Sequence, residues 1–208
     1  MHAVVFDIDG TLLRSAAVDD ALYKDAVRSV LGDAKIRPAL SDYDYVSDSG
    51  ILSQIFSDNS ISEVIEHEAA IKSRFVQLLS KHISEHGPFQ EIPGARAFLK
   101  RFDDSSEHAV AIATGGWRAS ALLKLETAGF GDIDIPIATS DDARDRQEIM
   151  RIALSQLGDS FSSVTYYGDG PWDRDASRQL GWNFVAVGSA LGGLESYAGI
   201  NSEEQPRR

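Results

Sequence analysis

The sequence predicts an α/β protein with a doubly wound, mainly parallel sheet and an inserted α-helical cap. Three observations lead to this prediction: five short apolar segments bounded by turn residues, segments of helical spacing between the later ones, and a gap of roughly a hundred residues after the first. With 208 residues and 43% hydrophobic composition, the chain is large enough to bury one such domain with a large insertion.

The first predicted strand covers residues 3–9, a β-branched and nearly continuous apolar run that Gly10 closes. Such a run is typical of a strand that is buried on both faces of a parallel sheet. Four further short apolar segments share this pattern and are predicted strands: 109–113, 135–139, 163–167 and 183–187.

Three segments between the later strands have apolar residues at helical spacing and are followed by a glycine, the expected cap of a helix C-terminus. They cover residues 117–128, 149–157 and 173–180. Strands that alternate with helices imply right-handed crossovers and therefore a mainly parallel sheet.

The connection between the first and second strands is far longer than the ~10 to 12 residues that a crossover needs. Within it, Leu22, Ala26 and Val30 recur every four residues, and residues 61–79 carry a second apolar stripe. We therefore predict a helical cap at residues 15–87.

The segments outside the cap complete the predicted organisation. Pro93 and Gly94 open a crossover helix that leads back to the sheet. Residues 1–14 and 88–198 are predicted to form the α/β core, and the polar residues 199–208 are predicted to be a flexible tail.

The charge balance of the chain is acidic, because 32 Asp and Glu residues against 20 Lys and Arg residues give a formal charge of −12. That field repels polyanions, so we expect no extended nucleic-acid interface. The absence of cysteine excludes a disulfide framework and a thiolate metal site. No apolar run reaches the ~18 to 20 residues of a membrane span, and Asp7 interrupts any N-terminal signal region. We therefore expect a cytoplasmic protein with no membrane partner.

Polar residues follow three of the predicted strands at the point where each strand ends. Asp7 and Asp9 close the first strand, Thr114 follows the second, and Asp169 and Asp173 follow the fourth. Open α/β sheets bind their ligands at this carboxyl edge. Alternation along a strand directs Asp7 and Asp9 to the same side, so these two carboxylates are expected to share one small volume.

If Asp169 joins Asp7 and Asp9, each pair of charges ~4 Å apart repels by ~4 kcal/mol at an effective dielectric constant of about 20. A cation or a shared proton must compensate this repulsion. Oxygen ligands without cysteine suit Mg²⁺, a hard ion that binds one or two carboxylates together with a substrate phosphate. The residues therefore indicate phosphoryl transfer.

Three motifs resemble those of the haloacid dehalogenase-like hydrolases, in particular the phosphatases with a helical cap. They are Asp7–Thr11 (Asp-Ile-Asp-Gly-Thr), Ala113–Gly116 (Ala-Thr-Gly-Gly) and Gly168–Asp173 (Gly-Asp-Gly-Pro-Trp-Asp). Their order, their spacing and the insertion after the first motif agree with that family, and the resemblance covers about residues 1–190. It implies a Rossmann-like core.

The resemblance also implies a role for each acidic residue. Asp7 is the expected nucleophile, which forms an aspartyl-phosphate, and Asp9 is the expected general acid and then general base. Mg²⁺ would be bound by the Asp7 carboxylate, the Asp9 backbone carbonyl and Asp169, with Asp173 as a direct or indirect partner.

Phosphate binding is assigned to residues of the second and third motifs. The Thr114 hydroxyl and the Gly115 N–H are expected to bind the phosphoryl oxygens. Members of the family usually carry a lysine in a third motif, and residues 141–148 contain none. Arg146 is the candidate replacement, with Arg144 as the alternative, and an arginine binds phosphate as a planar fork rather than as a point charge.

Together these expectations describe a Mg²⁺-dependent phosphatase, a phosphoric monoester hydrolase that acts on a small phosphorylated metabolite while a mobile cap closes over the site. Three alternatives stay open. Two are a phosphomutase and a haloacid dehalogenase of the same family, and the third is a non-enzymatic phospho-acceptor similar to response-regulator receivers. The sequence identifies neither the substrate nor the oligomeric state.

Overall fold

The computed structural model describes residues 1–158 and 160–200. Its strands are β1 (His2–Phe6), β2 (His108–Ala113), β3 (Ile137–Ala138), β4 (Ser163–Gly168) and β5 (Asn183–Ala186). Its α-helices are α1 (Ala16–Leu31), α2 (Asp48–Asp58), α3 (Val64–His86), α4 (Ala95–Asp103), α5 (Arg118–Leu125), α6 (Arg146–Ser155) and α7 (Pro171–Leu180). A π-helical turn at Glu126–Phe130 extends α5.

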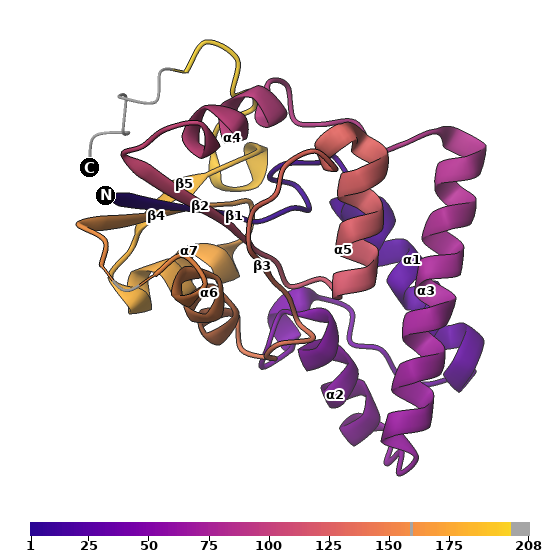
Figure 1. The fold of residues 1–208 in the computed structure, drawn as a ribbon. Helices are drawn as coiled ribbons and strands as arrows, with labels where there is room; N and C mark the ends of the chain where they lie inside the picture. Colours follow the sequence, from indigo (N-terminus) through magenta and orange to yellow (C-terminus); the bar gives the residue numbers. More distant parts are fainter. Residues whose placement is uncertain (159, 201–208) are drawn as a thin grey trace.

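The five strands form one parallel sheet in the order β3-β2-β1-β4-β5 (Figure 1). The chain starts at the central strand and continues toward one edge through β2 and β3 before it returns to form β4 and β5. This is the predicted doubly wound sheet, and the prediction of an α/β fold with a parallel sheet is confirmed. Phe6 of β1 is in register with Ile112 of β2 and Tyr167 of β4, so the residues that follow these three strands meet at one edge.

Three strands are shorter than predicted, among them β5, which ends one residue early at Ala186. β1 ends at Phe6 rather than at residue 9, because the N–H groups of Thr11, Leu12 and Leu13 turn back to the Ile8 carbonyl and take this segment out of the ladder. The predicted strand 135–139 contains only the two residues of β3.

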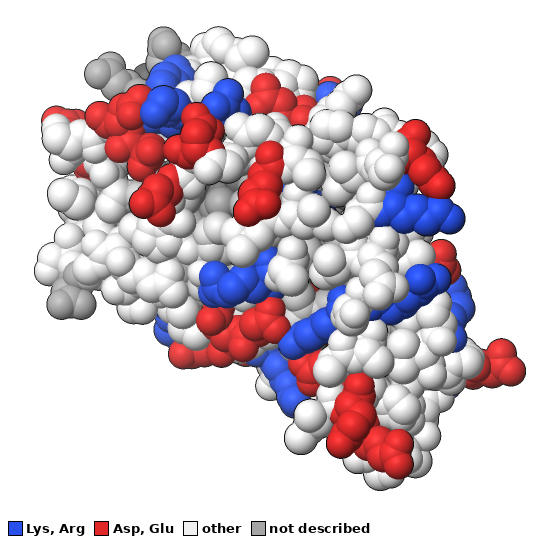
Figure 2. All heavy atoms as spheres, turned by 45° about the vertical axis from the view of Figure 1, so that its right-hand side comes forward, with Lys and Arg blue, Asp and Glu red and all other residues white. Residues whose placement is uncertain are grey.

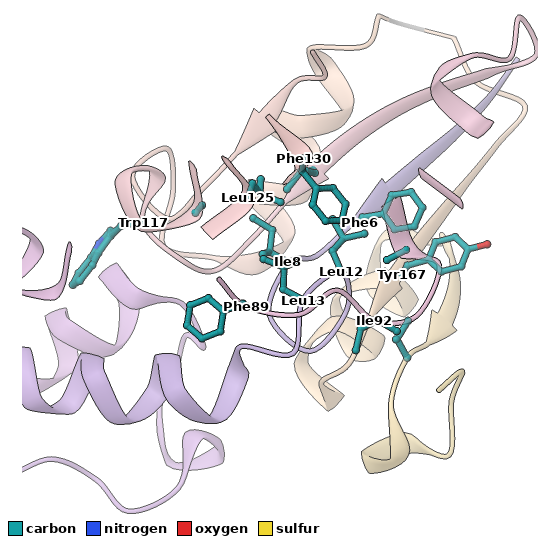
Figure 3. Close-up of a cluster of buried hydrophobic side chains, with 14 of the residues drawn as sticks. Phe6, Ile8, Leu12, Leu13, Phe89, Ile92, Trp117, Leu125, Phe130 and Tyr167 are labelled. Atoms are coloured by element: carbon teal, nitrogen blue, oxygen red, sulfur yellow. The ribbon is translucent and has the colours of Figure 1, made fainter. Parts of the chain in front are cut away.

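Helices cover both faces of the sheet. On one face, a hydrophobic cluster joins Phe6 and Tyr167 of the sheet to α4 and α5, and Figure 3 labels these two residues together with Leu125 and Phe130 of the same cluster. On the other face, Val5 and Tyr166 pack with apolar residues of α6 and α7. Burial on both sides explains why the central strands are apolar throughout.

The insertion between β1 and β2 is helical, as its periodicity predicts, and α1 packs against α3 in it (Figure 1). Helix α2 was not predicted, although Ile51, Leu52, Ile55 and Phe56 supply the apolar face that it buries. In α3 the apolar stripe is narrower than predicted, since Ile65 is 80% exposed. The hydrophobic cluster continues from the sheet into α1, α2 and α3.

Surface charge and chain ends complete the description. On the face that Figure 2 shows, acidic and basic side chains are interspersed, and the described residues form no broad basic area. Within residues 1–158 and 160–200, no helix combines the length and the apolar character that crossing a bilayer requires. Of the predicted flexible tail 199–208, residues 201–208 lie outside the described residues.

Candidate active site

A cavity of about 150 Å³ lies at the carboxyl edge of the sheet, next to the inserted helices. It is lined by residues that follow three neighbouring strands, which the parallel register brings together. Those lining residues include Asp7 and Asp9 after β1, Thr114 after β2, and Asp169 after β4. The structure therefore places these four predicted site residues around one cavity.

Three carboxylates form the deepest part of the site. Asp7, Asp169 and Asp173 each have an oxygen within 4.8 Å of the others, and Asp173 is 0% exposed. Burial, and next the negative charge of Asp173, raise the pKa of Asp169 to about 7. Burial likewise raises the pKa of Asp7 well above its ordinary value, although Arg146 opposes this shift. The positive charge of Arg146 is therefore not enough to compensate the three buried carboxylates.

The three carboxylates fit a hard divalent cation. All donors in the group are oxygens, the ligand type that Mg²⁺ and Ca²⁺ prefer. Oδ1 of Asp173 is buried without a hydrogen bond to any described residue, and such an orphaned acceptor is costly unless a ligand satisfies it. All three carboxylates belong to the set that the resemblance implies for the metal, in which Asp173 was expected as a direct or indirect partner.

Arg146 is the basic residue of this group. It begins helix α6, whose N-cap Asp145 accepts hydrogen bonds from two backbone N–H groups. Its Nη1 lies 3.5 Å from Oδ1 of Asp7 and its Nε lies 3.3 Å from Oδ1 of Asp173. Arg144 points elsewhere, since its Nη1 donates to the Ser53 hydroxyl at 2.9 Å. Of the two candidate arginines, the structure brings only Arg146 to the carboxylates.

Two glycines let the backbone approach these side chains closely. Gly10 has a φ of +78°, and a Cβ there would lie 2.0 Å from Oδ2 of Asp169. A Cβ on Gly115 would lie 2.7 Å from Nη2 of Arg146. Side chains at either position would displace a charged group of the site.

The Asp9 carboxylate lies outside the group of three and has different partners. Nζ of Lys124 donates to both of its oxygens at 2.7 Å, and the Ser15 hydroxyl donates to Oδ1 at 2.5 Å. Nζ of Lys124 also lies 2.5 Å from Oδ1 of Asp19, in helix α1. Burial, and next the negative charge of Asp9, raise the pKa of Asp19 to about 6.

Lys124 is a site residue that the sequence analysis missed. It is 0% exposed although it carries a charge. Burial lowers the pKa of Lys124, but the negative charges of Asp19 and Asp9 outweigh burial and raise this pKa above its ordinary value. The sequence gives no local signal for this burial, because lysine is an ordinary residue of an exposed helix face and its counter-charges come from distant parts of the chain.

Thr114 and the inserted helices form the other walls of the cavity. Thr114 is buried, and its hydroxyl accepts the N–H of Gly116 at 3.2 Å. Asp48, the first residue of α2, accepts the N–H of Trp117 at 2.9 Å, so the start of α2 is fixed to the segment after β2. Among the described lining residues, Arg146 is the only Lys or Arg.

Comparisons with known proteins identify relatives of this architecture. The family model of the haloacid dehalogenase-like hydrolases, described as a hydrolase, matches residues 1–181. No curated protein matches the chain.

Several solved structures have the same fold. A hydrolase from Pseudomonas syringae is 22% identical with a TM-score of 0.69, covering 89% of this chain and 84% of its own. CbbY from Rhodobacter sphaeroides in complex with phosphate is 18% identical with a TM-score of 0.68, covering 97% and 90%. The β-phosphoglucomutase of Clostridium difficile is 19% identical with a TM-score of 0.69, covering 91% and 85%.

Proposed function

Because the chain belongs to the haloacid dehalogenase-like hydrolases, we propose that it is a phosphatase that transfers the phosphoryl group of a small phosphate monoester to Asp7 and then to water. One observation carries the proposal. Buried Asp7 lies at the carboxyl edge of the sheet, beside Arg146 and close to the carboxylates of Asp169 and Asp173, a group that could hold a metal ion. The residues that would serve as nucleophile, phosphate-binding group and metal ligands therefore lie close together.

In the first step, a carboxylate oxygen of Asp7 forms a bond to phosphorus while the bond from phosphorus to the ester oxygen breaks. Asp9 donates a proton to that oxygen, which leaves as an alcohol. In the second step, a water oxygen attacks phosphorus, Asp9 takes the water proton, and Asp7 is released with inorganic phosphate. Both Asp7 and Asp9 line the cavity in which these steps would occur.

Phosphate oxygens would be held by groups on the other side of the cavity. The buried Thr114 hydroxyl and the backbone N–H of Gly115 lie after β2, and the Arg146 guanidinium lies beside Asp7. Arg146 would replace the lysine that is usual in the family and would oppose the charge that develops on the transferred group.

Mg²⁺ is the divalent ion that we propose for this site. The Asp7, Asp169 and Asp173 carboxylates would hold it, together with the Asp9 backbone carbonyl. When bound, such an ion neutralises phosphate charge and orients the substrate. The orphaned oxygen of Asp173 supports this assignment.

The cavity lining favours hydrolysis of a monophosphate over a phosphomutase reaction. A mutase that exchanges phosphate through a bisphosphate needs a second cationic site for the second phosphate. Bisphosphates do bind to proteins of this fold, since CbbY has been seen with xylulose-1,5-bisphosphate. Here Arg146 is the single Lys or Arg among the described lining residues, and the inserted helices contribute Asp19, Asp20 and Asp48 instead.

The proposal includes an organisation for the chain. Residues 15–87 would be the cap that covers the site and selects the substrate, and residues 1–14 and 88–198 would be the core that performs the chemistry. The contacts of Asp48 with the segment after β2 and of Asp19 with α5 support this division of roles. We expect the enzyme to act in the cytoplasm.

The test is phosphate release with and without Mg²⁺ from p-nitrophenyl phosphate, sugar monophosphates, phosphoglycolate and a sugar bisphosphate. We expect Mg²⁺-dependent turnover of monoesters, weak turnover of the bisphosphate, and a loss of at least about 1,000-fold in the Asp7→Asn variant. Turnover by Asp7→Asn near the wild-type rate would refute the assignment of the nucleophile. Isomerisation of a hexose phosphate without net phosphate release would instead establish a mutase.

A further inference from the structure

Lys124 is a buried charge that the mechanism above does not use. Its side chain is 0% exposed in helix α5, and burying an unpaired ammonium is strongly unfavourable. A hydrophobic residue would fill that place at lower cost, so the retention of a charge there calls for a reason. The contacts of Lys124 provide one.

All of the contacts of its ammonium lead to the proposed general acid or to the inserted helices. Nζ contacts both oxygens of Asp9 at 2.7 Å. A donor that contacts both oxygens restricts the orientation of the carboxylate more than a donor that contacts one oxygen. The third contact, at 2.5 Å, is with Asp19 of helix α1. Asp19 thus supplies a second counter-charge, which keeps the lysine in place.

Ser15 fixes the same carboxylate from another direction. Its hydroxyl donates to Oδ1 of Asp9 at 2.5 Å, and Ser15 directly precedes α1. The backbone N–H of Asp19 in turn donates to the Ser15 carbonyl at 2.9 Å. The orientation of the Asp9 side chain is consequently set by one lysine of the core and by the first turn of α1.

We propose that Lys124 is a positioning residue for proton transfer, which holds the Asp9 carboxylate in its working orientation and ties that orientation to the position of helix α1. The proposal rests on the proposed function, since it assumes that Asp9 protonates the leaving group. Lys124 does not touch the substrate in this scheme and acts only through Asp9.

The experiment compares two aryl esters in wild type and in the Lys124→Met variant, with the first turnover followed by rapid quenching. Phenyl phosphate has a poor leaving group that requires a proton from Asp9, whereas p-nitrophenyl phosphate has a good one that requires little help. We expect Lys124→Met to slow the first turnover of phenyl phosphate by about 100-fold and that of p-nitrophenyl phosphate by less than about fivefold. Lys100→Met, at a half-exposed position of α4, is the matched control and should leave both rates unchanged.

A double-mutant cycle with Asp9→Asn tests whether the effect passes through Asp9. If it does, Lys124→Met should slow the Asp9→Asn enzyme by no more than about twofold further. Lys124→Arg, which keeps the charge, should recover part of the phenyl phosphate rate. Equal losses on both esters, or losses that multiply in the double variant, would overturn the proposal and leave Lys124 a structural residue.

A second variant keeps the test decisive if Lys124→Met does not fold, as judged by its circular dichroism spectrum. Asp19→Asn retains the lysine but removes its link to α1, and we expect the same preferential loss on phenyl phosphate, of about tenfold. An Asp19→Asn enzyme with wild-type rates on both esters would contradict the coupling to α1. If wild type hydrolyses neither ester with Mg²⁺, the proposed function itself fails, and that result is distinct from each of these outcomes.

Discussion

The site contains two buried ion clusters, each with one basic side chain between two aspartates. They differ in how many of their polar atoms have hydrogen-bond partners. Arg146 lies between Asp7 and Asp173 at 3.3 to 3.5 Å, and its Nε and Oδ1 of Asp173 make no hydrogen bond. Lys124 lies between Asp9 and Asp19 at 2.5 to 2.7 Å. The Arg146 cluster therefore contains buried polar atoms without hydrogen-bond partners, whereas the atoms of the Lys124 cluster are in close contact with one another.

This difference distinguishes side chains that bind a ligand from side chains that position other residues of the protein. Unsatisfied buried polar atoms are costly, and they persist in proteins where a ligand completes them. The Arg146 cluster therefore has the character of a binding site, whereas the closely spaced Lys124 cluster has the character of a support. Three changes test this contrast, and each acts on one cluster while sparing the other.

The largest effect is expected from Arg146→Met. Loss of the guanidinium removes a preorganised positive charge from beside Asp7, and such a loss typically lowers kcat by about 100- to 1,000-fold. The measurement is steady-state hydrolysis of p-nitrophenyl phosphate with saturating Mg²⁺.

Arg144→Met is the matched control, because the Arg144 guanidinium binds the Ser53 hydroxyl and not the carboxylates. Its kcat should stay within about twofold of wild type. Comparable losses in the two variants would show that the position of Arg146 carries no special role.

A smaller effect concerns pH and the Lys124 cluster. The pKa of Asp19 is raised from 3.8 to about 6, so this carboxyl binds its proton more tightly in the folded state than in the unfolded state. Its contribution to stability is therefore complete below about pH 4 and is lost as the pH rises through about 6, a change on the order of 2 to 3 kcal/mol. Urea unfolding in EDTA between pH 4 and 7 measures the decline in stability. Asp169 also contributes to it, because its pKa is raised to about 7, and Asp19→Asn should remove the part that comes from Asp19.

Asp58 provides a control for the direction of this pH effect, because its pKa is shifted the opposite way. Hydrogen bonding from Arg37 lowers the pKa of Asp58 to about 2, so its contribution is lost as the pH falls. Asp58→Asn should accordingly leave the slope between pH 4 and 7 unaltered. A wild-type protein whose stability rises steadily over that interval would contradict the shift assigned to Asp19.

The third effect, similar in size to the second, is the stabilisation by Mg²⁺. An ion that binds only the folded state adds about 2.7 kcal/mol at a hundred times its Kd, which corresponds to roughly 5 to 10 °C in Tm for a chain of this size. Asp173→Asn should abolish the shift, and Asp175→Asn, at an exposed position of the same helix, should preserve it. Equal Tm values in Mg²⁺ and EDTA for wild type would remove the metal site from the proposal.

Sequence reasoning succeeded where local pattern and sheet topology coincide. The apolar strands predict the parallel sheet, and the parallel sheet by itself brings the residues after β1, β2 and β4 to one edge. Asp7, Thr114 and Asp169 could be grouped in this way because each follows a strand directly. Arg146 could be suggested only by its place in the third motif.

The remaining features depend on tertiary contacts that have no local signature. Lys124 is an ordinary helix residue by type, and only its contacts in the folded chain, such as the ion pair with Asp19 of α1, show that it is buried. Asp173 could be named from its motif as a direct or indirect metal partner, but its position beside Asp7 and Asp169 follows from the orientation of α7. Helix α2 begins in a polar aromatic stretch, which concealed the apolar face that follows it.

The in-register row of Phe6, Ile112 and Tyr167 has a consequence for how such enzymes diversify. Because the proposed reactive carboxylates follow strands that are joined by backbone ladders, replacements in the 15–87 segment other than at Ser15 and Asp19 would leave their spacing untouched. If residues 15–87 act as the proposed cap, a lineage built on this scaffold could exchange one metabolite for another by altering that segment while it keeps the same reaction.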